Sequence, residues 1–129
     1  MYCRGFNVYG QLGDGTTILS TSPVSVTGIG LITGLAGGAF HTCALNTVRV
    51  AYCWGLNNNG QLGDGTTSDR STPVAVAGGL TFGSLTAGET HTCGVTLGGK
   101  AYCWGSNGVG ELGDGTTTGR TTPVAVVNP

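Results

Sequence analysis

Short apolar runs alternate with longer polar, glycine-rich segments along the whole chain. The runs have the length of strands, and no segment keeps the i, i+3, i+4, i+7 apolar spacing of a helix over a useful length. Pro73 suits the start of a strand, and Gly98-Gly99 predicts a tight hairpin. The pattern predicts an all-β unit of four short strands, as in a propeller blade. In the middle of the chain the predicted strands are 72–76, 80–87, 91–97 and 100–105.

The same pattern recurs at a fixed spacing of about 50 residues, without insertion or deletion. The tetrapeptide Tyr-Cys-Trp-Gly at 52–55 returns at 102–105 and, with Arg in place of Trp, at 2–5. The octapeptide Gly-Gln-Leu-Gly-Asp-Gly-Thr-Thr at 10–17 also returns twice in register, once with Glu for Gln. A fixed period of this length is typical of solenoids, propellers and arrays. We therefore expect one repeat array over residues 1–129, with register copies at 2–51, 52–101 and, partially, 102–129.

The Gly-Asp-Gly loops predict structure rather than ligand binding. One Asp per loop cannot supply the six or more oxygens of a calcium site, and a phosphate cradle would need a helix and a nearby Lys. We expect the glycines to adopt positive φ, and Asp14, Asp64 and Asp114 to accept nearby backbone amides. A loop salt bridge from Asp64 to Arg70, or from Asp114 to Arg120, would contribute little if exposed. We expect no cofactor and no metal site.

Charge is sparse, and this excludes several classes of protein. The chain has 26 glycines but only 5 basic and 6 acidic side chains, with a formal net charge of −1. No basic stripe exists to neutralise phosphates, so we expect no nucleic acid partner. The uncharged stretch 15–48 is rich in Gly and Thr, and its register copy carries charges, so we expect strands rather than a membrane span. No signal peptide is visible in this segment.

The repeated sequence segments, taken together, resemble those of a known repeat. Tyr-Cys-Trp-Gly-x-Asn-x-x-Gly-Gln-Leu-Gly-Asp-Gly-Thr, then Thr-Pro-Val, then Leu-x-Ala-Gly-x-x-His-Thr-Cys, resembles RCC1 repeats, most of all the cysteine-bearing variety of bacterial proteins. The match covers essentially the whole chain. It implies RCC1-type blades of a seven-bladed β-propeller, here two full repeats plus a partial third. The founding member exchanges nucleotide on a small GTPase and docks on chromatin, whereas a secreted bacterial relative inhibits β-lactamases. Fold analogy alone does not choose between such activities.

Four of the five cysteines are spaced for pairing across hairpins. Cys93 and Cys103 flank the predicted hairpin at directly opposed positions, as do Cys43 and Cys53, and opposed Cα atoms lie within disulfide range. We therefore favour two structural disulfides. Two alternatives stay open: buried free thiols in a reducing compartment, and a zinc site that includes His41. Cys3 is the odd cysteine, and we expect it to be unpaired.

The histidines and tryptophans occupy the same place in each copy. A catalytic His is expected once, beside a unique nucleophile or carboxylate, whereas His41 and His91 repeat in register. We expect both to pack, with a ring nitrogen bonded to neighbouring backbone. Trp54 and Trp104 are expected to wedge between blades. The chain lacks an asymmetric polar cluster, and we expect no enzymatic activity.

The repeat is cut at both ends of the chain. Cys3 has no register partner, and the strands that should follow 123–127 are absent. Repeat arrays need neighbours to cover their apolar faces. We therefore expect an incomplete propeller, an internal fragment that needs further blades of a parent chain, with self-association as the alternative.

Function is expected where the copies differ, because recognition usually lies in loops carried on a rigid scaffold. We predict a protein-binding scaffold, part of an exported or cell-surface bacterial protein, with a protein partner. A nucleotide-exchange regulator of a small GTPase is the alternative, although this chain has no insertion of the kind which that activity requires in the founding member. Drift at solvated positions also accounts for such differences. The candidate partner-binding residues are Tyr9, Leu19, Phe40, Asn58, Asn59, Asp69, Glu89 and Val109.

Overall fold

Antiparallel strands make up all the regular secondary structure of residues 1–127, which are the residues that this computed structural model describes. That part of the chain contains no helix, and hence none long and apolar enough to cross a membrane. The all-β prediction is confirmed. The strands are β1 (Tyr2–Gly5), β2 (Ser20–Ser25), β3 (Ile32–Gly37), β4 (His41–Asn46), β5 (Ala51–Gly55), β6 (Arg70–Ala75), β7 (Phe82–Ala87), β8 (His91–Thr96), β9 (Ala101–Gly105) and β10 (Arg120–Ala125).

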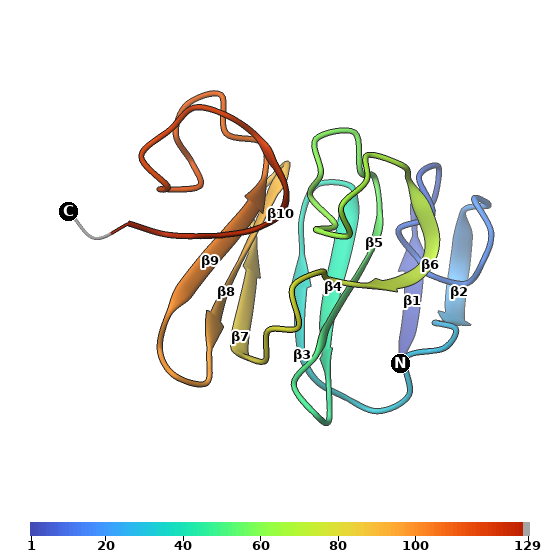
Figure 1. Ribbon diagram of the computed structural model, residues 1–129. Coiled ribbons are helices and arrows are strands. Elements are labelled where there is room, and N and C mark those ends of the chain that lie inside the picture. The colour runs from blue at the N-terminus through green and yellow to red at the C-terminus, as the bar shows by residue number, and fades with distance from the viewer. Residues whose placement is uncertain (128–129) are drawn as a thin grey trace.

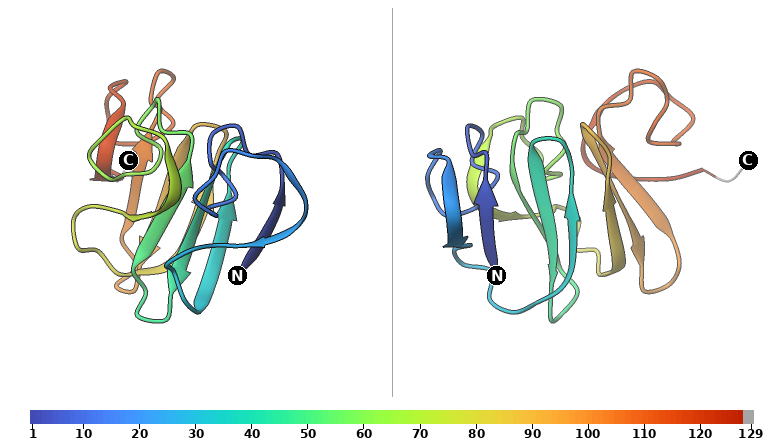
Figure 2. Two further views of the ribbon diagram at one scale, coloured as in Figure 1. Left: turned by 90° about the vertical axis from the view of Figure 1, so that its right-hand side faces the viewer. Right: turned by 180° about the vertical axis from the view of Figure 1, so that it is seen from behind.

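The strands form three sheets that follow one another as successive blades (Figure 1). Two sheets have four strands each, in the orders β3-β4-β5-β6 and β7-β8-β9-β10, and β1 pairs with β2 alone. Each four-stranded sheet is a meander of consecutive strands, and the edge strand β3 contacts the edge strand β7 of the next sheet. Figure 2 shows the same succession from the side and from behind. Each four-stranded sheet takes its strands from two adjoining register copies.

The hairpin register agrees with the spacing of the cysteines. Cys93 lies opposite Cys103, and the next pairs are Gly94 with Tyr102 and Val95 with Ala101, as predicted. Disulfides join Cys93 to Cys103 and Cys43 to Cys53, each with a Cα–Cα distance of 4.1 Å. Among the described residues Cys3 keeps a free thiol, and burial raises its pKa.

Two strands begin at other residues than the apolar runs indicate. β6 begins at Arg70 instead of residue 72, because Arg70 pairs with Gly55 across an irregularity in the ladder. β7 begins at Phe82 instead of residue 80, and the Phe82 backbone N–H bonds outside its own sheet, to the Arg49 carbonyl. Pairing within the sheet therefore sets the start of β6, and a hydrogen bond between sheets accompanies the start of β7.

The core lies between the sheets, because side chains alternate across each strand. Along β5, Ala51 and Cys53 belong to the cluster that faces the next sheet, whereas Tyr52 and Trp54 belong to the cluster that faces β1 and β2. Trp54 and its register copy Trp104 are fully buried, which confirms their predicted position between blades. Burying a ring of this size stabilises the packing by about 4 kcal/mol. Packing between sheets therefore aligns the loops that each sheet carries.

Candidate functional site

Each long loop after β1, β5 and β9 is organised by one buried asparagine. In the loop after β5 the Asn57 side chain is fully buried. Its Nδ2 donates to the carbonyls of Thr66 and Ser68 at 3.0 Å each and to Asp64 Oδ1 at 3.2 Å. Its Oδ1 accepts the Leu62 N–H at 3.0 Å. These bonds fix the loop conformation from within. Asn7 and Asn107 make the corresponding bonds.

The aspartate of the loop stabilises the loop itself through hydrogen bonds, as predicted. Asp64 Oδ1 accepts both the backbone N–H and the hydroxyl of Thr66, and Oδ2 pairs with Arg70 Nε at 3.1 Å. Burial opposes ionisation of Asp64, but these hydrogen bonds outweigh it and lower the pKa. Asp114 pairs with Arg120 at 2.8 Å, and hydrogen bonding, chiefly from its neighbouring threonine hydroxyl, holds its pKa well below the usual range. Both carboxyls stay ionised and paired.

The loop after β1 docks on the following sheet through one carbonyl and one glycine. Gln11 O accepts Thr42 Oγ1 at 3.0 Å and Trp54 Nε1 at 2.9 Å. Gly13 has a φ of 74° and lies so close to the indole that a Cβ there would be 2.7 Å from Trp54 Nε1. The positive φ and the close approach both require glycine. The loop after β5 docks in the same register, although Trp104 Nε1 has no hydrogen-bond partner within residues 1–127.

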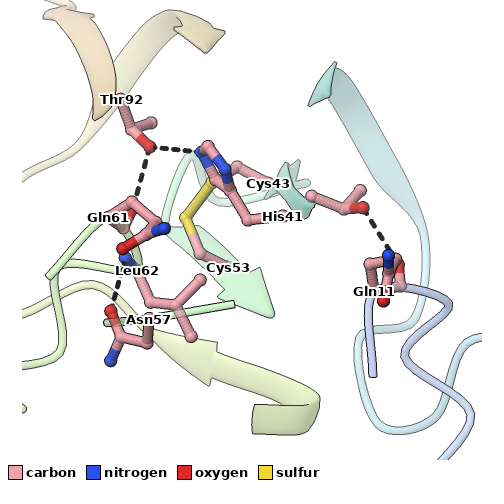
Figure 3. The surroundings of a disulfide bond; sticks show 9 residues. Gln11, His41, Cys43, Cys53, Asn57, Gln61, Leu62 and Thr92 are labelled. Carbon is pink, nitrogen blue, oxygen red and sulfur yellow. Dashed lines mark hydrogen bonds between the residues drawn. A yellow bond between two sulfur atoms is a disulfide. The ribbon is translucent and has the colours of Figure 1, made fainter. Parts of the chain in front are cut away.

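His41 links two sheets, as Figure 3 shows. Its Nε2 lies 2.9 Å from Thr92 Oγ1, and the Thr92 hydroxyl donates to Gln61 O at 2.8 Å. Because that hydroxyl proton is already used, Nε2 must donate, which leaves Nδ1 as a buried acceptor without a partner. Burial, and secondly the charge of His91, lower the pKa of His41 to about 4. The buried position of His41 agrees with the predicted packing role. The predicted hydrogen bond to backbone is wrong, because His41 bonds a threonine side chain.

For His91 the structure gives no ring hydrogen bond to backbone among residues 1–127, so the same expectation is not met there. Its ring instead lies against Gly88, where a Cβ would meet the imidazole. The described residues also contain no group of three His, Cys, Asp or Glu side chains placed to hold a metal ion.

Three aromatic rings meet on one face of the molecule. Loops after β1, β5 and β9 and the β3–β4 and β7–β8 turns gather at one end of the strands (top of Figure 1). There the ring centroid of Phe40 lies 5.2 Å from that of Tyr9 and 6.0 Å from that of Phe6. Phe6 is 54% and Phe40 39% exposed. We call Phe6, Tyr9 and Phe40 the aromatic cluster.

The cluster belongs to the first copy of the repeat. The register positions of Tyr9 and Phe40 hold Asn59 and Thr90 in the second copy. Tyr9 and Phe40 were predicted contact residues, and the structure brings them together. Phe6 was missed, although its register position also differs between copies, with Leu56 in the second.

Glu89, another predicted residue, adjoins the cluster: its backbone carbonyl accepts the Ala39 N–H at 3.3 Å, and Ala39 precedes Phe40.

The other predicted contact residues lie outside the cluster. Asp69 is exposed, but its Oδ1 accepts the Asn57 N–H at 2.8 Å and so stabilises its own loop. Val109 is 90% exposed in the loop after β9. The remaining three are exposed on the loops that they occupy: Leu19, Asn58 and Asn59.

Three of the solved structures to which the chain is similar, two of them of the same yeast protein, illustrate the likeness. Prp20p from Saccharomyces cerevisiae, described with its binding to Gsp1p and histones, is 21% identical with a TM-score of 0.82, over 98% of this chain and 33% of that protein. Human WBSCR16 is 21% identical with a TM-score of 0.87, over 98% and 34%. Yeast RCC1 (Prp20) bound to Kap60 is 20% identical with a TM-score of 0.79, over 98% and 32%. The chain thus spans about a third of the propellers it matches, and at this identity the likeness shows the fold.

No curated protein sequence matches the chain. Family comparison gives a direct match to the regulator of chromosome condensation (RCC1) repeat, over residues 1–45 and 50–95. A second description of the same repeat matches 32–61 and 84–111. These ranges cover most of the chain and agree with the blades and loops described above. The chain belongs to the RCC1 repeat family.

Proposed function

We propose that this chain is a non-enzymatic scaffold that binds a protein partner through the aromatic cluster Phe6, Tyr9 and Phe40. The observation that carries the proposal is the exposure of Phe6 and Phe40 beside Tyr9, on the face where the loops gather. Aromatic side chains supply much of the energy at binding hot spots. Loops held by buried hydrogen bonds present them with little loss of conformational entropy.

The polar groups of the loops support a binding role rather than catalysis. Asp64 and Asp114 are ionised and bound by arginines, which leaves neither of them free to transfer a proton. His41 is buried and its Nε2 bonds Thr92. A general acid or base must reach a substrate, and these groups are instead used to hold the fold.

The disulfides support an oxidising compartment. Disulfides persist in secreted and surface proteins and are rare in reducing cytosol. Together with the resemblance to the cysteine-bearing bacterial variety of the repeat, this favours an exported or cell-surface bacterial protein. Because the chain spans about a third of the propellers that it matches, we propose that further blades accompany it in the working molecule.

Affinity capture with matched variants tests the proposal. The immobilised chain is compared with the double variant Tyr9→Ala/Phe40→Ala and with a control, Val48→Ala/Leu97→Ala, which removes two exposed apolar side chains from the hairpins at the opposite end of the strands. Quantitative mass spectrometry should show a partner whose recovery falls at least about tenfold with the first variant and is unchanged with the control. Equal recovery with both variants would contradict the proposed site.

Nucleotide exchange on a small GTPase stays an alternative prediction. The similarity to Prp20p is at the level of the fold, as is the similarity to WBSCR16. Release of a fluorescent guanine nucleotide from small GTPases, with and without the chain, measures this activity. Acceleration that survives Tyr9→Ala/Phe40→Ala would favour exchange over the proposed scaffold.

A further inference from the structure

Each pair of neighbouring sheets is joined by a side chain from the first strand of the following sheet, β3 or β7, which we call its inner strand. Between the two four-stranded sheets this side chain is Phe82, which is 1% exposed and packs in one cluster with Ala51 and Val76. The Phe82 N–H donates to Arg49 O at 2.9 Å. The contact thus combines a buried ring with one backbone hydrogen bond.

The first interface uses the same register positions with different side chains. There Met1 and Val26 take the places of Ala51 and Val76, and Ile32 takes the place of Phe82. In both cases the valine N–H bonds the carbonyl of its partner, at 3.1 Å for Val26 and 3.0 Å for Val76. At the first interface two aliphatic side chains of similar size, Met1 and Ile32, pack against the same cluster, whereas at the second a small Ala accompanies a large Phe. The two interfaces therefore fill the same register positions in two different ways, each suited to close packing.

The β8–β9 hairpin carries the same pair of register positions a third time. No residue of 1–127 inserts beside that pair. Ala101 and Val126 are in register with Ala51 and Val76, and the Val126 N–H again bonds the Ala101 carbonyl at 3.0 Å. Beside them is a cavity of about 390 Å³, a size within the range of ligand sites. It is lined by Gly98, Gly99, Lys100, Ala101 and Val126.

We infer that this cavity is an insertion site for an aromatic side chain on the inner strand of a further RCC1-type blade. Ala101 matches the small Ala51, which accompanies Phe82, rather than Met1, which accompanies Ile32, so the match favours a ring of the size of Phe82 over an Ile. The N–H of the inserted residue donates to Gly99 O, because Gly99 has a φ of 85° and Arg49, the acceptor at the filled interface, a φ of 67°. The two hairpin turns therefore present this carbonyl in the same way.

A second intact copy of the chain is a poor occupant. Its own Phe82 is already buried between its sheets, and its Ile32 packs in the other core cluster. Its sheet of β1 and β2 has no inner strands of its own to offer. The occupant must be a separate blade with a free inner strand.

The test uses the whole chain, labelled with ¹⁵N, and a synthetic peptide with the sequence of residues 77–88, which contains the inner strand with Phe82. Two further peptides carry Ile or Ala at the Phe position. At about millimolar peptide we expect amide shifts at Gly99, Ala101 and Val126, with binding about tenfold weaker for the Ala peptide than for the Phe peptide. Shifts confined to other residues, or equal affinity of all three peptides, overturn the inference.

A size swap in the cavity supplies the second measurement. The variant Ala101→Met introduces the side chain that shares a core cluster with Ile32 at the first interface, and should reverse the preference from the Phe peptide to the Ile peptide. Leu97→Met, at an exposed position of the same hairpin, is the matched control and should keep the Phe preference. Unchanged preference in Ala101→Met overturns the inference. Two disulfides by non-reducing mass measurement verify that each variant has folded.

Discussion

Acidification should destabilise this protein through His41 before Asp64 or Asp114 is protonated. The folded protein holds the His41 ring neutral down to about pH 4, because the ring is buried, whereas an unfolded chain protonates it near its ordinary pKa of 6.5. Between these values the unfolded state binds more protons, so stability falls as pH falls. The contribution is complete above pH 6.5 and is lost progressively toward pH 4.

The magnitude follows from the separation of the two pKa values. The difference between 6.5 and about 4 corresponds to a loss of about 3 kcal/mol in the free energy of unfolding. For a domain of ordinary stability this is a large fraction of the total. Asp64 and Asp114 have pKa values lowered from 3.8, so their contributions are lost only below that pH. Glu111 has a pKa lowered from 4.5, so its contribution is lost only below that pH, and the window from pH 6.5 to 4.5 therefore reports on the histidine.

Urea unfolding at intervals from pH 7 to pH 4 measures the effect. The variant His41→Gln removes the titrating group and should show a much flatter dependence on pH across this window. His91→Gln, at the register copy of His41, should keep most of the slope, because the charge of His91 is the lesser cause of the shift. The reasoning is refuted if His41→Gln and the unmodified chain lose stability equally between pH 6.5 and pH 4.

Two further changes test the packing between blades and the hairpins. Gly63→Ala should lower the free energy of unfolding by about 2 to 4 kcal/mol, because φ at Gly63 is 70° and the new Cβ would lie 2.7 Å from Trp104 Nε1. Gly99→Ala is the control: φ is 85° there and no atom lies within 4 Å of the new Cβ, so the loss in the same urea titration should be about 1 kcal/mol. Replacing Cys93 and Cys103 together by alanine should cost about 2 to 3 kcal/mol. Thermal unfolding of this variant and of the unmodified chain, both without reductant, measures that loss, and equal midpoints would contradict it.

The sequence by itself determined the repeat, the strands and the hairpin register. These features depend on local patterning: apolar runs of strand length, glycines at turns and cysteines at opposed positions. The pairing of Cys93 with Cys103 could be predicted because a tight hairpin leaves one register that opposes them. The bond of Asp64 to its own loop could be predicted because such bonds span a few residues.

The tertiary structure decided what meets across copies. Phe6 joined Tyr9 and Phe40, and His41 bonded Thr92, only because one sheet docks on the next at a particular distance and angle. The cavity at Ala101 can likewise be interpreted as an insertion site only by comparison with the two filled interfaces. A repeating sequence fixes each blade through nearby residues, whereas contacts between blades depend on the summed packing of many side chains. For this reason the contacts between blades could not be predicted from single positions in the sequence.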